Sequence, residues 1–170
     1  EVEHLALEGP GIWGEGQLAA KDLIRGPWAG GVAGSLHLSQ LPAAARLEDF
    51  GGVVSMDARF DVGESISLNA DLQSEGIRTP WASLSDVGFG LHTRRDGRLY
   101  LLGGFRSAGG QFTLDGSMPL ESARGSVSAH LDLSGLDLAR AARMPALRDA
   151  AREFAPEGVM RLTADLGAYA

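Results

Sequence analysis

The residues that could perform acid–base or metal chemistry are spread thinly along this chain. His4, His37, His92 and His130 stand far apart, and no His-x-His or His-x3-His spacing would bring two imidazoles to one metal ion. The absence of cysteine also excludes disulfides, thiol nucleophiles and thiolate metal ligands. We interpret the histidines as solvated side chains on strand surfaces and expect no bound metal.

A pair of carboxylates for glycoside hydrolysis is the second chemistry to consider. Such pairs sit in clefts with aromatic platforms, whereas aromatic residues make up only 6% of this chain. No Gly-x-Ser-x-Gly elbow is present, and the glycines at 103–104 and 109–110 flank a hairpin instead of leading into a helix. We therefore predict that the protein is not an enzyme and needs no cofactor. The aspartates that alternate onto polar strand faces are Asp57, Asp71, Asp115, Asp132 and Asp165.

These residues belong to a pattern that recurs along the chain, in which apolar and polar side chains alternate with a period of two. Ile66–Leu72, Phe112–Met118 and Val127–Leu133 are the clearest copies. Successive side chains of a strand point to opposite faces, so each copy predicts a strand with one apolar and one polar face. Roughly nine such strands, joined by short turns, favour antiparallel neighbours. We predict an all-β fold: a long, curved, mainly antiparallel sheet in the form of a trough, with one short kinked helical segment.

Residues 137–157 form the exception to this alternation. Leu138, Leu147 and Phe154 fall near helical spacing, and Pro145 interrupts them, which predicts two segments or a kink. The excursion mixes arginines with acidic residues, so it fits either a membrane-surface helix or a helix packed over the end of the sheet. We favour the packed helix.

The three tryptophans, Trp13, Trp28 and Trp81, also allow more than one interpretation. They could form a lipid-interface belt or a platform for a sugar, because their rings combine a large apolar surface with one polar group. Large aromatic side chains more often act as partly buried anchors, and this is the interpretation we prefer.

The bulk composition limits the partners and the number of domains. A chain of 170 residues is long enough for one domain, and its net charge of −7 without a basic cluster excludes nucleic acid as a partner. No apolar run approaches the ~18 residues of a membrane-spanning helix. The chain begins at Glu1 without methionine. We therefore expect residues 1–170 to be a single fragment of a longer repetitive β-groove protein, anchored in the membrane by segments outside it.

One apolar face of the expected sheet has little in the sequence to cover it. A helix is ~10 Å wide, whereas nine strands at ~4.8 Å spacing span roughly 43 Å. The remaining face can fold into a sandwich, close into a barrel, or curl into an open trough that holds an apolar guest. A trough of seven-residue strands, each about 23 Å long, is wide enough for an acyl chain. In that trough we expect the lipid groove to be lined by Leu68, Leu72, Val87, Phe89, Leu99, Leu101, Phe105, Phe112, Leu114, Leu131, Leu133 and Leu162.

The segments GQFTLDGSMPL and GSVSAHLDLSGLDL, and the run SGLDLARAARMPALRDAAREFAPEGVMRLTADL, resemble the repetitive β-rich regions of the AsmA-like superfamily, above all its TamB-type members. The resemblance covers residues 50–170 better than the first 50. It implies a β-sheet folded like a taco and apolar within. It also implies a periplasmic protein of Gram-negative bacteria, held in the inner membrane by an N-terminal helix that is absent here. The family conducts phospholipids towards the outer membrane and has no catalytic residues.

Residues and resemblance together predict a segment of a periplasmic lipid conduit, with phospholipid or another acyl-chain lipid as its partner. The alternative is an assembly or translocation module for outer-membrane proteins, whose sheet edges pair with the strands of an outer-membrane barrel protein by β-augmentation. An enzyme built on a β-sandwich is a third hypothesis, which no residue pattern favours.

Overall fold

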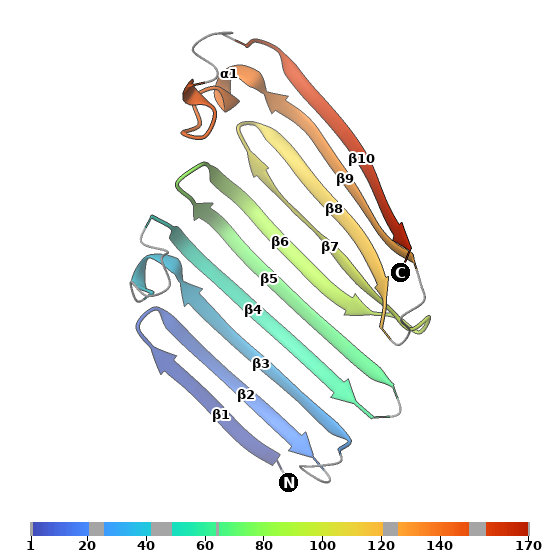
Figure 1. The fold of residues 1–170 in the computed structure, drawn as a ribbon. Helices are drawn as coiled ribbons and strands as arrows, with labels where there is room; N and C mark the ends of the chain where they lie inside the picture. The colour runs from blue at the N-terminus through green and yellow to red at the C-terminus, as the bar shows by residue number, and fades with distance from the viewer. Residues whose placement is uncertain are drawn as a thin grey trace.

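A single antiparallel sheet makes up nearly all of the structure (Figure 1). The computed structural model describes residues 2–20, 26–41, 49–63, 65–120, 126–149 and 156–169. The strands stand in the sheet in the order in which they occur in the chain, each antiparallel to the next. They are β1 (Val2–Gly9), β2 (Ile12–Ala20), β3 (Trp28–His37), β4 (Gly51–Val62), β5 (Ile66–Arg78), β6 (Ser83–Thr93), β7 (Arg98–Ser107), β8 (Gly110–Pro119), β9 (Ser126–Asp137) and β10 (Val159–Tyr169).

The prediction of an all-β fold with a long, curved, antiparallel sheet is confirmed, with ten strands in place of roughly nine. The strands are also longer than the alternation indicated. β5, for example, continues beyond Leu72 to Arg78, and Pro80 lies in the connection to β6. A proline there removes no ladder hydrogen bond, which agrees with its exclusion from the interior of sheets.

Two tight turns follow directly from their residues. β7 and β8 are joined through Ala108 and Gly109, which both have positive φ (48° and 81°), as a two-residue turn with the twist of its strands requires. β6 and β7 are joined by a turn whose Gly97 has a φ of 72°. Both connections were predicted as turns, and they keep neighbouring strands in register.

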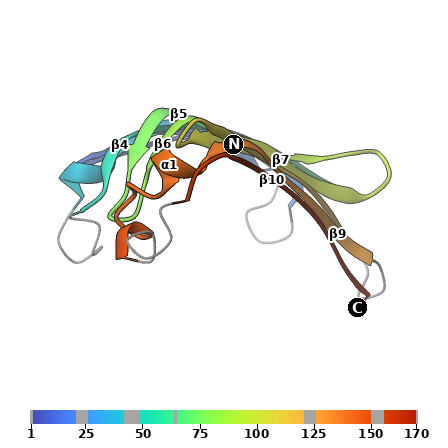
Figure 2. The ribbon, with the colours of Figure 1, turned by 90° about the horizontal axis from the view of Figure 1, so that it is seen from above.

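The sheet is bent into an arch, as Figure 2 shows. Its register shifts at three places, between Gly52 and Ser55, between Ser85 and Gly88, and between Met160 and Leu162. Such bulges bend a strand and increase its twist. Gly52 has a φ of 118°, and a Cβ there would collide with the carbonyl oxygen of Gly76, so this bulge requires glycine.

Little helix is present, and it lies on the concave side of the arch (Figure 2). α1 (Leu138–Ala141) begins where the side chain of Asp137 accepts a hydrogen bond from the backbone N–H of Arg140. The chain then makes turns over residues 142–147 and is helical again at Arg148 and Asp149, which agrees with the predicted interruption at Pro145. Residues 150–155 lie outside the described part. A 3-10 turn, η1 (Leu38–Gln40), follows β3. Both pieces lie at the same end of the strands (Figure 1).

The described residues contain no second layer over the sheet. Among them, only Ala20, Leu38 and Ala141 are buried apolar residues. The accessible surface of 11763 Å² far exceeds the ~8,000 Å² expected of a compact monomer of this mass, 17.8 kDa. Stability therefore comes from the backbone ladders and from side-chain pairs across neighbouring strands, each worth about 0.2–1 kcal/mol.

Candidate functional site: an uncovered apolar face

The strand register brings the apolar positions of all ten strands to one face, called here the apolar face. Residues that pair across an antiparallel ladder share a face. Leu68 pairs with Phe60, Leu101 with Leu91, and Leu133 with both Phe112 and Leu162. The pairing can be followed without interruption from Leu5 and Leu7 in β1 to Leu162 and Leu166 in β10.

All twelve residues that the sequence predicts as a lining lie on this apolar face, in β5 to β10. Most are half-buried by their neighbours in the sheet, whereas Leu72 and Leu162 keep 41% and 51% of their surface exposed. Phe105 and Phe112 stack with ring centroids 4.8 Å apart. The structure thus gathers the predicted residues into one surface, although their proposed contact with lipid stays a prediction.

The apolar face continues into β1 to β4, which the predicted lining omits. Here it is hollowed by 580 Å³. The residues whose side chains the register directs into this hollow are all apolar or glycine: Leu5, Leu7, Ile12, Gly14, Gly16, Leu18, Val32, Gly34, Leu36, Val54, Met56, Phe60 and Leu72. Their alternation is the signal that could have found them, but glycines in β2 and β3 weaken it.

The opposite face, called here the polar face, carries the groups that could do chemistry. The register directs all four histidines, and the five aspartates named as carboxylate candidates, to it. Asp57 stands directly opposite Asp71, and both are exposed. No cluster of three or more metal-ligating side chains occurs within the described ranges. Within the described ranges these groups therefore lie in rows along the polar face.

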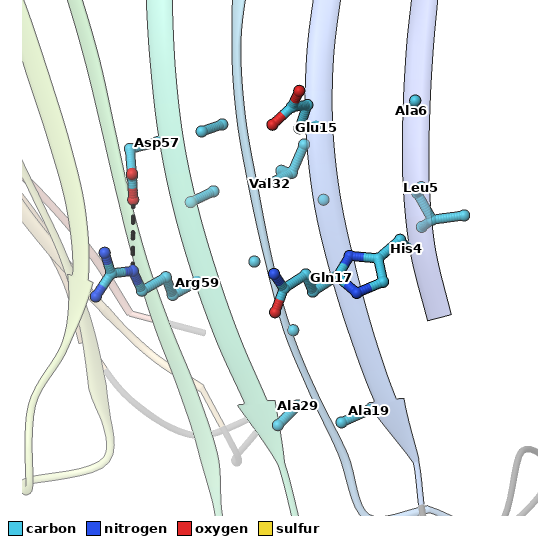
Figure 3. A pocket seen from close by; sticks show the side chains of 15 residues that line it. His4, Leu5, Ala6, Glu15, Gln17, Ala19, Ala29, Val32, Asp57 and Arg59 are labelled. Atoms are coloured by element: carbon cyan, nitrogen blue, oxygen red, sulfur yellow. Dashed lines mark ion pairs between the residues drawn. The ribbon is translucent and has the colours of Figure 1, made fainter. Parts of the chain in front are cut away.

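A hollow of 840 Å³ lies on the polar face over β1 to β4 (Figure 3). Small residues such as Ala29 and Ala33 form much of its lining, and His4, Glu15 and Gln17 border it. The Nε of Arg59 lies 3.6 Å from the Oδ1 of Asp57, but both side chains are largely exposed. Because water screens such a pair, this hollow has no desolvated charge with which to hold a ligand.

The strongest interaction on the polar face joins β9 to β10. The Nδ1 of His130 lies 2.6 Å from the Oδ1 of Asp165, and both side chains are exposed. The hydrogen bond that the carboxylate of Asp165 accepts from His130, with the negative charges of Asp132 and Asp115 nearby, raises the pKa of His130 above its ordinary value of 6.5, against a smaller effect of desolvation. Thr163 donates a hydrogen bond of 3.0 Å to Asp132 in the next row. These polar pairs connect the strands on the water side.

The tryptophans are more exposed than the anchor interpretation predicts. Trp13 lies on the polar face and Trp28 on the apolar face. Trp81 packs edge-on against Phe50, with centroids 5.8 Å apart, and still exposes 58% of its surface. None of the three is buried, because the described part of the chain supplies no layer over either face.

No helix in the described ranges has the length and apolar character needed to cross a membrane. Comparison with protein-family models, with curated proteins and with solved structures finds no match to this chain.

Proposed function

We propose that this chain is a segment of a periplasmic lipid conduit, which carries phospholipid acyl chains along its apolar face between the inner and outer membranes. One observation carries the proposal: an apolar face runs across ten strands and has no covering layer in the described chain. Uncovered apolar surfaces of this extent mark sites that bind an apolar partner.

The chemistry of the face favours an acyl chain as its guest. Its side chains are mainly Leu, Val, Phe, Met and Ala from one strand to the next, with few groups that could bind a polar ligand. An acyl chain lies on such a surface through its methylenes, each worth roughly 0.8 kcal/mol when fully buried, while its head group stays in water. Movement along the surface then exchanges one set of apolar contacts for an equivalent one, so the mechanism is passive.

The proposed location of the protein in the periplasm has a different basis. Resemblance to AsmA-like proteins, TamB above all, supports a periplasmic location, anchoring in the inner membrane through an N-terminal helix outside this chain, and transport towards the outer membrane. The chain has no feature that favours catalysis, and we propose that it is not an enzyme.

Native mass spectrometry of the purified protein tests the proposal, with bound phospholipid as the expected result. Leu101 and Leu102 provide a matched pair of variants, because they are neighbours on β7 that lie on opposite faces. Leu101→Arg places a charge on the apolar face and is expected to weaken lipid binding. Leu102→Arg places the same charge opposite Asp115 on the polar face and is expected to retain it. Equal binding by both variants would refute the proposed role of the apolar face.

The alternative, assembly of outer-membrane proteins by β-augmentation, is favoured by the two edges of the sheet. In the described structure, β1 and β10 each pair with a strand on one side only, and neither contains proline. Such edges can add a partner strand. Photocrosslinkers placed at Leu101 and at β10 distinguish the two functions: lipid adducts at Leu101 support the conduit, and protein adducts confined to β10 support assembly.

A further inference from the structure

The hollow on the apolar face has a floor made of glycine, and this floor is open. Gly14, Gly16 and Gly34, called here the glycine floor, lie side by side in β2 and β3. A Cβ built on Gly14 would meet only backbone, the carbonyl oxygen of Ala33 at 3.5 Å and the Cα of Gly34 at 3.9 Å. A Cβ on Gly34 would collide with the backbone carbonyl of Trp13. One on Gly16 would lie 3.0 Å from the carbonyl oxygen of Gly31 and beside the flank of Val32, so Gly14 is the one of the three with room for a side chain. No large side chain therefore fills the space above the glycine floor.

Two other glycines on the same face are covered by aromatic rings. A Cβ on Gly30 would meet ring atoms of Phe60 at 2.8 and 3.0 Å. A Cβ on Gly103 would collide with the ring of Phe89, which pairs with it from β6. In these two places an aromatic ring from the neighbouring strand occupies the space that glycine leaves. The glycine floor, like Gly116 in β8, has no ring among its nearest atoms, and it borders the hollow of 580 Å³, which Gly116 does not line.

The shape of the hollow selects its occupant. On β2 the open strip runs from Gly14 to Gly16 and is bounded by Ile12 and Leu18. Two residues of strand measure ~7 Å, which is narrower than the ~10 Å of an α-helix. Across the strands the lining extends from β1 to β5, and four strand spacings amount to ~19 Å, enough for one acyl chain of the ~15 Å that it occupies in a membrane leaflet.

The chemistry of the lining points the same way. Trp13, Glu15, Gln17 and Ser35 border the hollow, but the register directs their side chains to the polar face. A peptide strand laid in the hollow would leave its own backbone N–H and C=O groups without partners, which is unfavourable in an apolar site. A chain of methylenes has no such groups.

We propose that this hollow is a seat for one acyl chain, which lies across β1 to β5 above the glycine floor. This seat rests on the proposed function and specifies where on the apolar face a lipid binds. A lipid that moves along the apolar face is held longest over β1 to β5, where the hollow lies. Over β6 to β9, leucine and phenylalanine side chains raise the floor, and the lipid makes shallower contacts.

Two valine substitutions test the seat. Gly14→Val adds a side chain that strands favour at a site without a backbone conflict, and it fills the hollow. Gly88→Val makes the same change on the polar face of β6, where a Cβ would have no atom within 4 Å. Circular dichroism and the melting temperature establish that both variants fold. Leu7→Asn provides a second variant, because Leu7 lines the hollow from an edge strand and is 62% exposed.

The probe is a photoreactive sixteen-carbon fatty acid with a diazirine at its terminal carbon, mapped by mass spectrometry of the crosslinked peptides. We expect wild type and Gly88→Val to crosslink in β1, β2 and β4. We expect Gly14→Val to bind about four- to eightfold more weakly, because valine takes the place of two or three methylenes, each worth about twofold in Kd when covered from one side only. Leu7→Asn should weaken binding in the same direction.

Three outcomes would overturn the seat. Equal binding by wild type, Gly14→Val and Leu7→Asn, with crosslinks spread over β6 to β10, removes the seat and leaves the conduit. Crosslinking between copies of the chain through the hollow assigns it to a protein partner instead. Absence of fatty-acid binding in every variant removes both the seat and the proposed function.

Discussion

The dependence of fatty-acid affinity on chain length follows from the one-sided geometry of the sheet. A fully buried methylene contributes about 0.8 kcal/mol to binding. The described chain has no layer opposite the apolar face, so a guest is covered from below and meets water above. We therefore expect about half of that value, ~0.4 kcal/mol per methylene, or roughly a twofold decrease in Kd for each added carbon. From ten to sixteen carbons, the Kd should fall about 60-fold.

Displacement of a fluorescent fatty acid, at concentrations below micelle formation, measures this series. The expected slope of log Kd is about −0.3 per methylene. A ligand present at 100 times its Kd adds about 2.7 kcal/mol to the free energy of unfolding. For a chain of 170 residues this raises the melting temperature by about 5–11 °C.

Two results would refute this reasoning in opposite ways. A flat series means that the apolar face does not bind the acyl chain. A slope near −0.6 per methylene means that the chain is surrounded on all sides, and therefore that the sheet closes around it in solution. Leu7→Asn is the control, because it weakens the hollow over β1 to β5 and should raise the Kd of every fatty acid in the series.

Three further predictions concern the stability of the sheet. Asp165 raises the pKa of His130, so this pair adds to the free energy of unfolding. That addition is fully present below the pKa of the histidine in the unfolded chain and is lost as the pH rises through its higher pKa in the folded state. An NMR titration should give His130 a pKa above 6.5, and Asp165→Asn should lower that pKa. A double-mutant cycle that replaces Phe105 and Phe112 by alanine should give a coupling of about 1 kcal/mol in urea unfolding, and additive effects would mean that the stacked pair is not formed. Gly52→Ala should lower the free energy of unfolding by about 2 kcal/mol, because it forces a Cβ at positive φ against the carbonyl oxygen of Gly76. The control, Gly88→Ala, should change the free energy of unfolding by less than about 0.5 kcal/mol. Equal effects of the two substitutions would contradict the bulge at Gly52.

Alternation alone was sufficient to predict the class of the fold and the common face of the twelve predicted lining residues. Leu68, Phe112 and Leu131 share a face because a period of two leaves them no other arrangement once the strands are antiparallel. The short turns between the strands made the antiparallel order predictable as well.

Other features depended on interactions between strands, which a period of two does not contain. The extension of β5 to Arg78 requires partners on both sides, Gly51 in β4 and Ser83 in β6. The lengths of the helical pieces were also not predictable from spacing, because α1 ends at Ala141 and turns continue to Leu147. The hollow was missed because glycines 14, 16 and 34 weaken the apolar pattern at the positions that create it.

The order of the strands bears on how such a molecule could change its length. Every strand bonds only to the strand before it and the strand after it in the chain, so contacts remain local along the polypeptide. Architectures built from nearest-neighbour interfaces tolerate the gain or loss of a unit without rearrangement of the others. Insertion of one more hairpin would displace the later strands by about 10 Å and leave every other interface intact. Duplication of short stretches of coding sequence can therefore lengthen such a sheet strand pair by strand pair.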